Sequence, residues 1–100
     1  MLVERELVIK HKTGLHARPA ALFVQLANKY ESDISIVKED QKVNGKSIMG
    51  ILMLAAEKGA KITIIADGED AEQAVEELSS RLLKEEELDF QDRGESNEGI

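Results

Sequence analysis

Strand-like and helix-like segments alternate along this 100-residue chain, and their order restricts the folds that it can adopt. The strand-like segments alternate apolar and polar residues or are rich in β-branched residues, whereas the helix-like segments repeat apolar residues at spacings of three and four. In chain order, the predicted elements are a strand at 2–9, a helix at 16–28, strands at 33–38 and 42–44, a helix at 47–56, a strand at 60–66 and a helix at 69–84.

The second and third strands are separated only by a predicted turn at 39–41. A connection this short joins antiparallel neighbours, because a parallel pair needs a crossover of a dozen residues or more. The order β-α-β-β-α-β-α therefore favours an α+β fold, in which three helices cover one face of a four-stranded antiparallel sheet.

The charge of the chain is concentrated at its C-terminal end. The net charge is −7, and residues 85–100 hold seven acidic residues against Arg93 alone, which gives −6 for this segment. We expect one domain over residues 1–88, followed by an acidic, disordered tail at 89–100. The overall acidity argues against nucleic acid as a direct partner.

Composition and N-terminal pattern exclude several other classes. The chain has no cysteine, so disulfides and thiol chemistry are excluded, and His11 and His16 lack the further ligand pattern of a metal site. No apolar run approaches the ~18 residues of a membrane span, and the first residues lack the pattern of a signal peptide. We expect a cytoplasmic protein that needs neither metal nor cofactor.

The most informative motif is Gly-Leu-His-Ala-Arg-Pro-Ala at residues 14–20, where a glycine loop meets a predicted helix. The first turn of a helix presents unpaired N–H groups that attract anions, and the guanidinium of Arg18 suits phosphate oxygens. With an ordinary pKa near ~6.5, the imidazole of His16 can act as a nucleophile. Taken alone, these residue types favour a surface histidine beside a solvated arginine over an active site.

The motif resembles the active-site signature of HPr, the histidine-containing phosphocarrier of the bacterial phosphoenolpyruvate-dependent sugar phosphotransferase system. The resemblance covers roughly residues 2–85, including the segments 44–50 and 57–60. It implies an open-faced β-sandwich in which Nδ1 of His16 is phosphorylated. Arg18 and the backbone N–H groups of Ala17 and Arg18 would stabilise the phosphoryl group.

The same resemblance implies the partners and the type of activity. Enzyme I would donate the phosphoryl group, and the IIA domains of sugar permeases would receive it. The protein would be a covalently phosphorylated carrier, not an ordinary enzyme, and we expect a monomer.

Ser47 precedes the second predicted helix, and serine is a preferred N-cap residue. Because position 50 is glycine, a reciprocal capping box is not expected. The resemblance to HPr of Gram-positive type adds a second role, phosphorylation of Ser47 by HPr kinase/phosphorylase. The added negative charge would weaken docking to enzyme I and could recruit catabolite control protein A, which would link the protein to carbon catabolite control.

The segment 47–54 is apolar nearly all round, which is more than one buried stripe requires. Part of it must enter the core, but an exposed remainder would indicate a partner interface, and methionine suits a surface that accepts several partners. From the resemblance, Ile48, Met49 and Leu52 are the expected interface residues, and Met53 belongs to the same apolar run.

Three alternatives stay open at this point. An HPr paralogue could serve as a regulator or in a nitrogen-related phosphorelay, although a purely regulatory paralogue is expected to lack the histidine that this chain has at His16. A small-molecule regulatory domain of ferredoxin-like build shares the element order but leaves the motif at 14–20 unexplained. In an inert interaction module, replacing His16 would change nothing.

Overall fold

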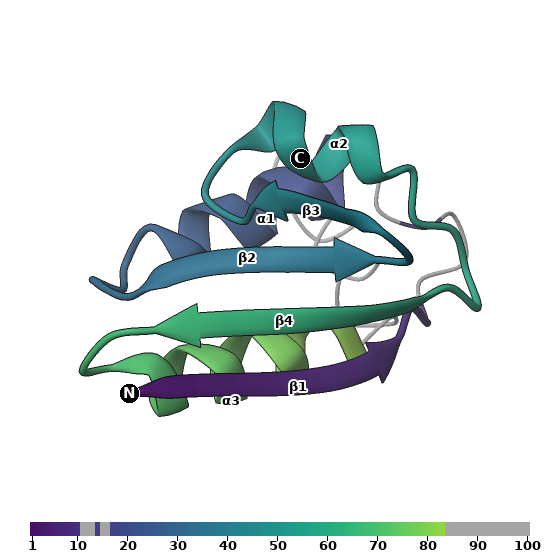
Figure 1. Cartoon of the computed structure of the whole chain (residues 1–100). Coiled ribbons are helices and arrows are strands. Elements are labelled where there is room, and N and C mark those ends of the chain that lie inside the picture. Colours follow the sequence, from purple (N-terminus) through teal and green to yellow (C-terminus); the bar gives the residue numbers. More distant parts are fainter. Residues whose placement is uncertain (11–13, 15–16, 84–100) are drawn as a thin grey trace, which may run out of the picture.

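The computed structural model describes residues 1–10, 14 and 17–83, and its elements follow the predicted order (Figure 1). They are β1 (Leu2–Val8), α1 (Ala17–Ala27), β2 (Asp33–Lys38), β3 (Gln41–Asn44), α2 (Ile48–Leu54), β4 (Lys61–Asp67) and α3 (Ala71–Leu83).

The strands form one sheet in the order β1-β4-β2-β3, and every neighbouring pair is antiparallel. The register pairs Leu2 with Asp67 and Val8 with Lys61, so the end of β1 lies beside the start of β4. β1 and β3 are the two edges of the sheet. The predicted α+β class with a four-stranded antiparallel sheet is confirmed.

The core lies between the sheet and the helices, which Figure 1 shows on one side of the strands. Along β4, and along β2 up to Val37, every second residue is buried, and the residues between them are exposed or half-buried. A strand with this alternation has one face in the core and one in contact with water. The buried strand residues are Leu7, Ile34, Ile36, Ile62, Ile64 and Ala66, and they meet Phe23, Ala27, Ala74, Val75 and Leu78 of the helices.

Several boundaries differ from the predictions by one or two residues, and at two of them a residue other than glycine adopts positive φ. β3 begins at Gln41, which pairs with Lys38, because Glu39 turns the chain with a φ of +56°. α2 ends at Leu54, two residues early, because Ala55 has a φ of +50° and donates its N–H to the carbonyl of Leu52 at 3.1 Å. This left-handed residue with its back-directed hydrogen bond is a common helix C-terminus.

The predicted boundary at residue 88 and the disordered tail at 89–100 lie outside the described residues and stay predictions. No helix within the described part of the chain combines the length and apolar character that a membrane crossing requires.

Candidate functional site

The helix that carries the histidine motif begins at Ala17. Its first turn contains Arg18, whose side chain is exposed, and Pro19, which is buried. Proline is tolerated here because N–H groups in the first turn have no carbonyl partner within the helix. The backbone N–H groups of Ala17 and Arg18 belong to this turn, as the phosphoryl-binding prediction requires. His16 itself lies outside the described residues, so its role stays a prediction.

Gly14, which precedes this helix in the motif, has a constrained backbone. It is buried and has a φ of +76°, in the left-handed region that favours glycine. A Cβ atom at this position would lie 2.5 Å from the carbonyl oxygen of Ala56 and 2.9 Å from Cα of Glu57. Gly14 is therefore packed against the backbone of the segment that follows α2, and α1 packs against α2.

Ser47 is the N-cap of α2, as predicted. Its backbone is extended, with φ −118° and ψ 121°, and its Oγ accepts a hydrogen bond from the N–H of Gly50 at 3.0 Å. The preceding turn is closed by Asn44, whose Oδ1 accepts from the N–H of Lys46 at 2.8 Å. Because the residue at position 50 is glycine, no side chain there reaches back to the cap.

The side chain of Lys46 anchors this turn to the far end of α1. Its Nζ donates to the carbonyl of Tyr30 at 2.7 Å, and the hydroxyl of Tyr30 in turn donates to Glu77 of α3. The pKa of Tyr30 is raised to about 12. The main cause is the hydrogen bond to Glu77, and the second is the burial of the hydroxyl. Tyr30 therefore stays protonated at neutral pH, and this chain of contacts connects the segment before Ser47 to both long helices.

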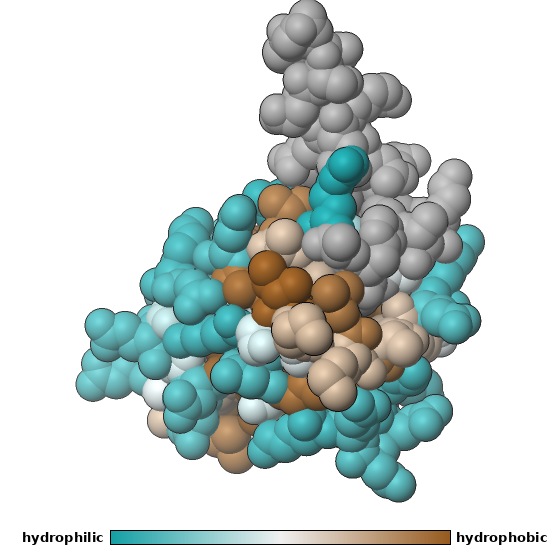
Figure 2. All heavy atoms as spheres, turned by 90° about the horizontal axis from the view of Figure 1, so that it is seen from above, coloured by the Kyte–Doolittle hydropathy of each residue, from teal (hydrophilic) through white to brown (hydrophobic). Residues whose placement is uncertain are grey.

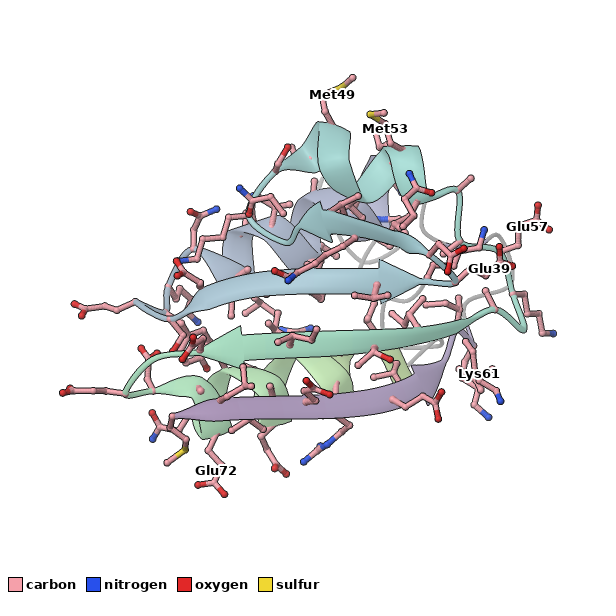
Figure 3. All side chains as sticks on the ribbon, viewed as in Figure 1. Glu39, Met49, Met53, Glu57, Lys61 and Glu72 are labelled. Atoms are coloured by element: carbon pink, nitrogen blue, oxygen red, sulfur yellow. The ribbon has the colours of Figure 1, made fainter. Side chains whose placement is uncertain are left out.

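The exposed face of α2 is apolar. Met49 and Met53 are 66% and 64% exposed, Ile48 is 43% exposed, and Leu52 is half-buried; we call these four residues the α2 surface. Figure 2 shows hydrophobic side chains gathered on the face of the molecule that α2 occupies. In Figure 3, Met49 and Met53 project from α2 away from the sheet.

The three predicted interface residues therefore differ in the fraction of the side chain that is exposed to a partner. Ile48 and Met49 are open to solvent, and Leu52 offers only part of its side chain. Met53 was not among the predicted interface residues, although its spacing of four from Met49 places both on one helix face.

Comparison with known families identifies the class of this protein. The family model for the phosphorylation site of the HPr component of the phosphotransferase system matches residues 3–84. The chain belongs to this HPr family, whose members are phosphocarriers of that system and not enzymes in the ordinary sense.

Individual relatives are similar over nearly their whole length. The HPr-like protein Crh of Bacillus subtilis is 48% identical over 84 residues, which are 84% of this chain and 99% of Crh. The crystal structure of HPr-C-His from Thermoanaerobacter tengcongensis is 47% identical and matches with a TM-score of 0.81, covering 83% of this chain and 93% of that one.

A crystal structure of Bacillus subtilis Crh, 48% identical with a TM-score of 0.68 over 83% of this chain and 95% of that one, is a domain-swapped, intertwined dimer. The expectation that our chain is a monomer is at odds with this dimeric relative.

Proposed function

We propose that this chain is a phosphocarrier that accepts a phosphoryl group from phospho-enzyme I on His16 and transfers it to IIA domains of sugar permeases. Membership in the HPr family supports the proposal. The observation that carries it is the motif at residues 14–20, which begins at the constrained Gly14 and leads into the first turn of α1.

The chemistry is a phosphoryl transfer between nucleophiles. Nδ1 of the neutral His16 imidazole attacks the phosphorus, a phosphorus–nitrogen bond forms, and the bond to the donor residue of enzyme I breaks. The charge of Arg18 and the N–H groups of the first turn stabilise the phosphoryl oxygens during the transfer. A nucleophile of the IIA domain then takes the group and leaves His16 unmodified. The carrier returns to its unmodified form only when it transfers the phosphoryl group to an acceptor. It must therefore stabilise the phosphohistidine only modestly, since a very stable adduct would not be transferred.

Phosphorylation by enzyme I tests this function directly. The protein is incubated with phosphoenolpyruvate and a bacterial enzyme I, and its intact mass is measured before and after brief acid treatment. We expect one added phosphoryl group that acid removes, and no addition to His16→Ala. His11→Ala is the matched control, because it removes the other histidine of the chain and should be phosphorylated normally. No addition with several enzyme I preparations would contradict the proposal.

We also propose that Ser47 is a regulatory phosphorylation site for an HPr kinase/phosphorylase, acting on phosphoryl transfer and on carbon catabolite control. Similarity to Crh, a catabolite repression protein of Bacillus subtilis, favours this second role. Ser47 is half-buried at the head of α2, next to the exposed Ile48. A phosphate there would add about −1.5 to −2 charges beside the α2 surface, where it would oppose docking to an acidic partner.

The two modifications differ in acid stability, so one experiment separates them. Incubation with ATP and an HPr kinase/phosphorylase should add an acid-stable phosphate, and Ser47→Ala should remain unmodified. Ser35→Ala, in β2, is the control. The Ser47-phosphorylated protein should then accept phosphoryl groups from enzyme I more slowly and should bind catabolite control protein A, whereas an unchanged rate of acceptance would contradict the regulatory role.

We propose a cytoplasmic location, because both the donor and the IIA acceptors of this system act there.

A further inference from the structure

The sulfur atoms of this chain are concentrated on the α2 surface. The chain has no cysteine and three methionines, so thioether sulfur is the only sulfur available for oxidation. Met49 and Met53 lie four residues apart on one face of α2, and about two thirds of each residue is exposed. Figure 3 shows both side chains pointing away from the body of the molecule.

Neighbouring residues of α2 show that the exposure of this pair is specific to one face. Ile51 and Leu54 are 0% and 1% exposed, so the opposite side of the helix enters the core. A reagent in solution therefore reaches both sulfur atoms without any opening of the fold, and methionine oxidation follows exposure.

Met1 provides an internal reference. It is also 66% exposed, but it precedes β1, at one edge of the sheet, whereas α2 packs against β3 at the opposite edge. Oxidation of Met1 therefore reports the reactivity of an exposed methionine remote from the α2 surface.

We propose that Met49 and Met53 are an oxidation-sensitive pair through which peroxide controls docking of the α2 surface to enzyme I. The reaction is oxidation of each thioether by hydrogen peroxide. The sulfur gives up two electrons and gains one oxygen atom, the oxygen–oxygen bond breaks, and the second oxygen leaves as water. The two methionine sulfoxide reductases, one for each sulfoxide epimer, reverse the change with two electrons from a thiol reductant and release the oxygen as water, so the modification can act as a switch.

Oxidation weakens docking because the interface must then bury a polar sulfoxide in place of an apolar thioether. The thioether is apolar and flexible, whereas the sulfoxide is polar and needs a hydrogen-bond donor. A partner surface that fits the thioethers leaves the sulfoxide oxygen without a donor, and an unsatisfied buried polar group weakens binding about tenfold or more. This inference rests on the proposed function and on the prediction that Ile48, Met49 and Leu52 belong to the surface that meets enzyme I.

The experiment uses the full chain treated with graded hydrogen peroxide. Intact mass counts the added oxygen atoms, and peptide mapping assigns them to Met1, Met49 or Met53. The initial rate of phosphoryl transfer from phospho-enzyme I is then measured against carrier concentration. We expect the KM of the treated protein to rise about tenfold and to return to its starting value after treatment with both methionine sulfoxide reductases and a dithiol reductant. The thermal unfolding midpoint is recorded to establish that the treated protein stays folded.

Met49→Leu/Met53→Leu is the decisive variant. It keeps an apolar α2 surface and retains Met1 as its oxidisable sulfur, so its own KM should be the same before and after peroxide. An unchanged KM in the oxidised wild-type chain would overturn the inference, as would an equal rise in the variant or a rise that accompanies unfolding. Failure of the untreated chain to accept a phosphoryl group would instead overturn the proposed function and, with it, this inference.

Discussion

The carboxylate of Asp70 accepts two hydrogen bonds from Ser32, one from its backbone N–H at 3.0 Å and one from its hydroxyl. The other carboxylate oxygen accepts from the backbone N–H of Glu31 at 2.9 Å. Asp70 directly precedes α3, and residues 31–32 precede β2, so one side chain joins two loops that are distant in sequence. These bonds, above all that from the Ser32 hydroxyl, lower the pKa of Asp70, because they stabilise the charged form.

Asp70→Asn should lower the free energy of unfolding at neutral pH, and the loss should disappear in acid. Because the pKa of Asp70 is lower in the folded protein than its ordinary value of 3.8, its contribution is complete above that value and is lost as the pH falls through the folded pKa. Urea denaturation of variant and wild type at a series of pH values checks this. Asp40→Asn, in the exposed β2–β3 turn, is the control, and a deficit that persists undiminished in acid would contradict the prediction.

Ser79→Ala should stabilise the protein by about 1 kcal/mol, because the hydroxyl of Ser79 is buried without a hydrogen-bond partner among the described residues. Alanine also has the higher helix propensity. Ser80→Ala is the matched control on the same helix, since Ser80 is half-buried and its replacement adds mainly the propensity gain. Thermal or urea denaturation should rank Ser79→Ala above Ser80→Ala, and the opposite order would be evidence against the unsatisfied hydroxyl.

Ala55→Gly should stabilise the C-terminus of α2, by up to about 1 kcal/mol. Ala55 has a φ of +50°, which costs a residue with a Cβ about 1–2 kcal/mol, and the greater unfolded-state freedom of glycine offsets part of the gain. Ala55→Val, with a β-branched side chain, should destabilise the protein for the same reason. The pair of urea midpoints is the measurement, and a valine variant as stable as the glycine one would refute the argument.

The sheet could be predicted from sequence because its strands are rich in β-branched residues and its two central strands bury alternate residues. Ile62 and Ile64 are buried while Thr63 is half-buried, and this pattern directly reflects one face in the core. The end of α2 was missed because Ala55 adopts positive φ without being glycine or asparagine. The turn at Glu39 was predicted, but the positive φ of Glu39 makes it one residue shorter than predicted. Such conformations are imposed by the surrounding sheet and helix packing, which local sequence does not record.

The site was predictable in part, for a different physical reason. The capping of α2 by Ser47 follows from local hydrogen bonding, which a short sequence window contains. Which face of α2 is exposed does not follow from local sequence. A helix that is apolar all round has no preferred face until α1 and β3 pack against it. That packing buries Ile51 and exposes Met53, which explains why Met53 escaped the interface prediction.

Truncation after Leu88 should leave phosphoryl transfer and the unfolding midpoint unchanged. The 84 residues that align with Crh are 99% of that protein, so the family fold is complete without a segment like 89–100. The rate of phosphorylation by enzyme I and the thermal unfolding midpoint of the two chains are compared. Loss of transfer in a truncated chain that is still folded would show that the tail takes part in the reaction.

Gly14→Ala and Gly59→Ala form a matched pair that isolates the packing of the histidine loop. Both glycines have positive φ, +76° and +92°, so alanine is strained at either position by about 1–2 kcal/mol. A Cβ at residue 59 meets nothing within 4 Å, whereas at residue 14 it would approach the carbonyl oxygen of Ala56 to 2.5 Å.

Gly14→Ala should therefore destabilise the protein more than Gly59→Ala. It should also slow phosphoryl transfer even under conditions where the variant is fully folded, because the backbone at Ala56 cannot retreat without moving the end of α2, and the loop that leads to His16 must shift instead. Gly59→Ala should lose stability but keep the transfer rate of its folded fraction. Urea denaturation and the rate of phosphorylation by enzyme I are measured for both, and equal effects on transfer would mean that the contact between Gly14 and Ala56 does not position the histidine.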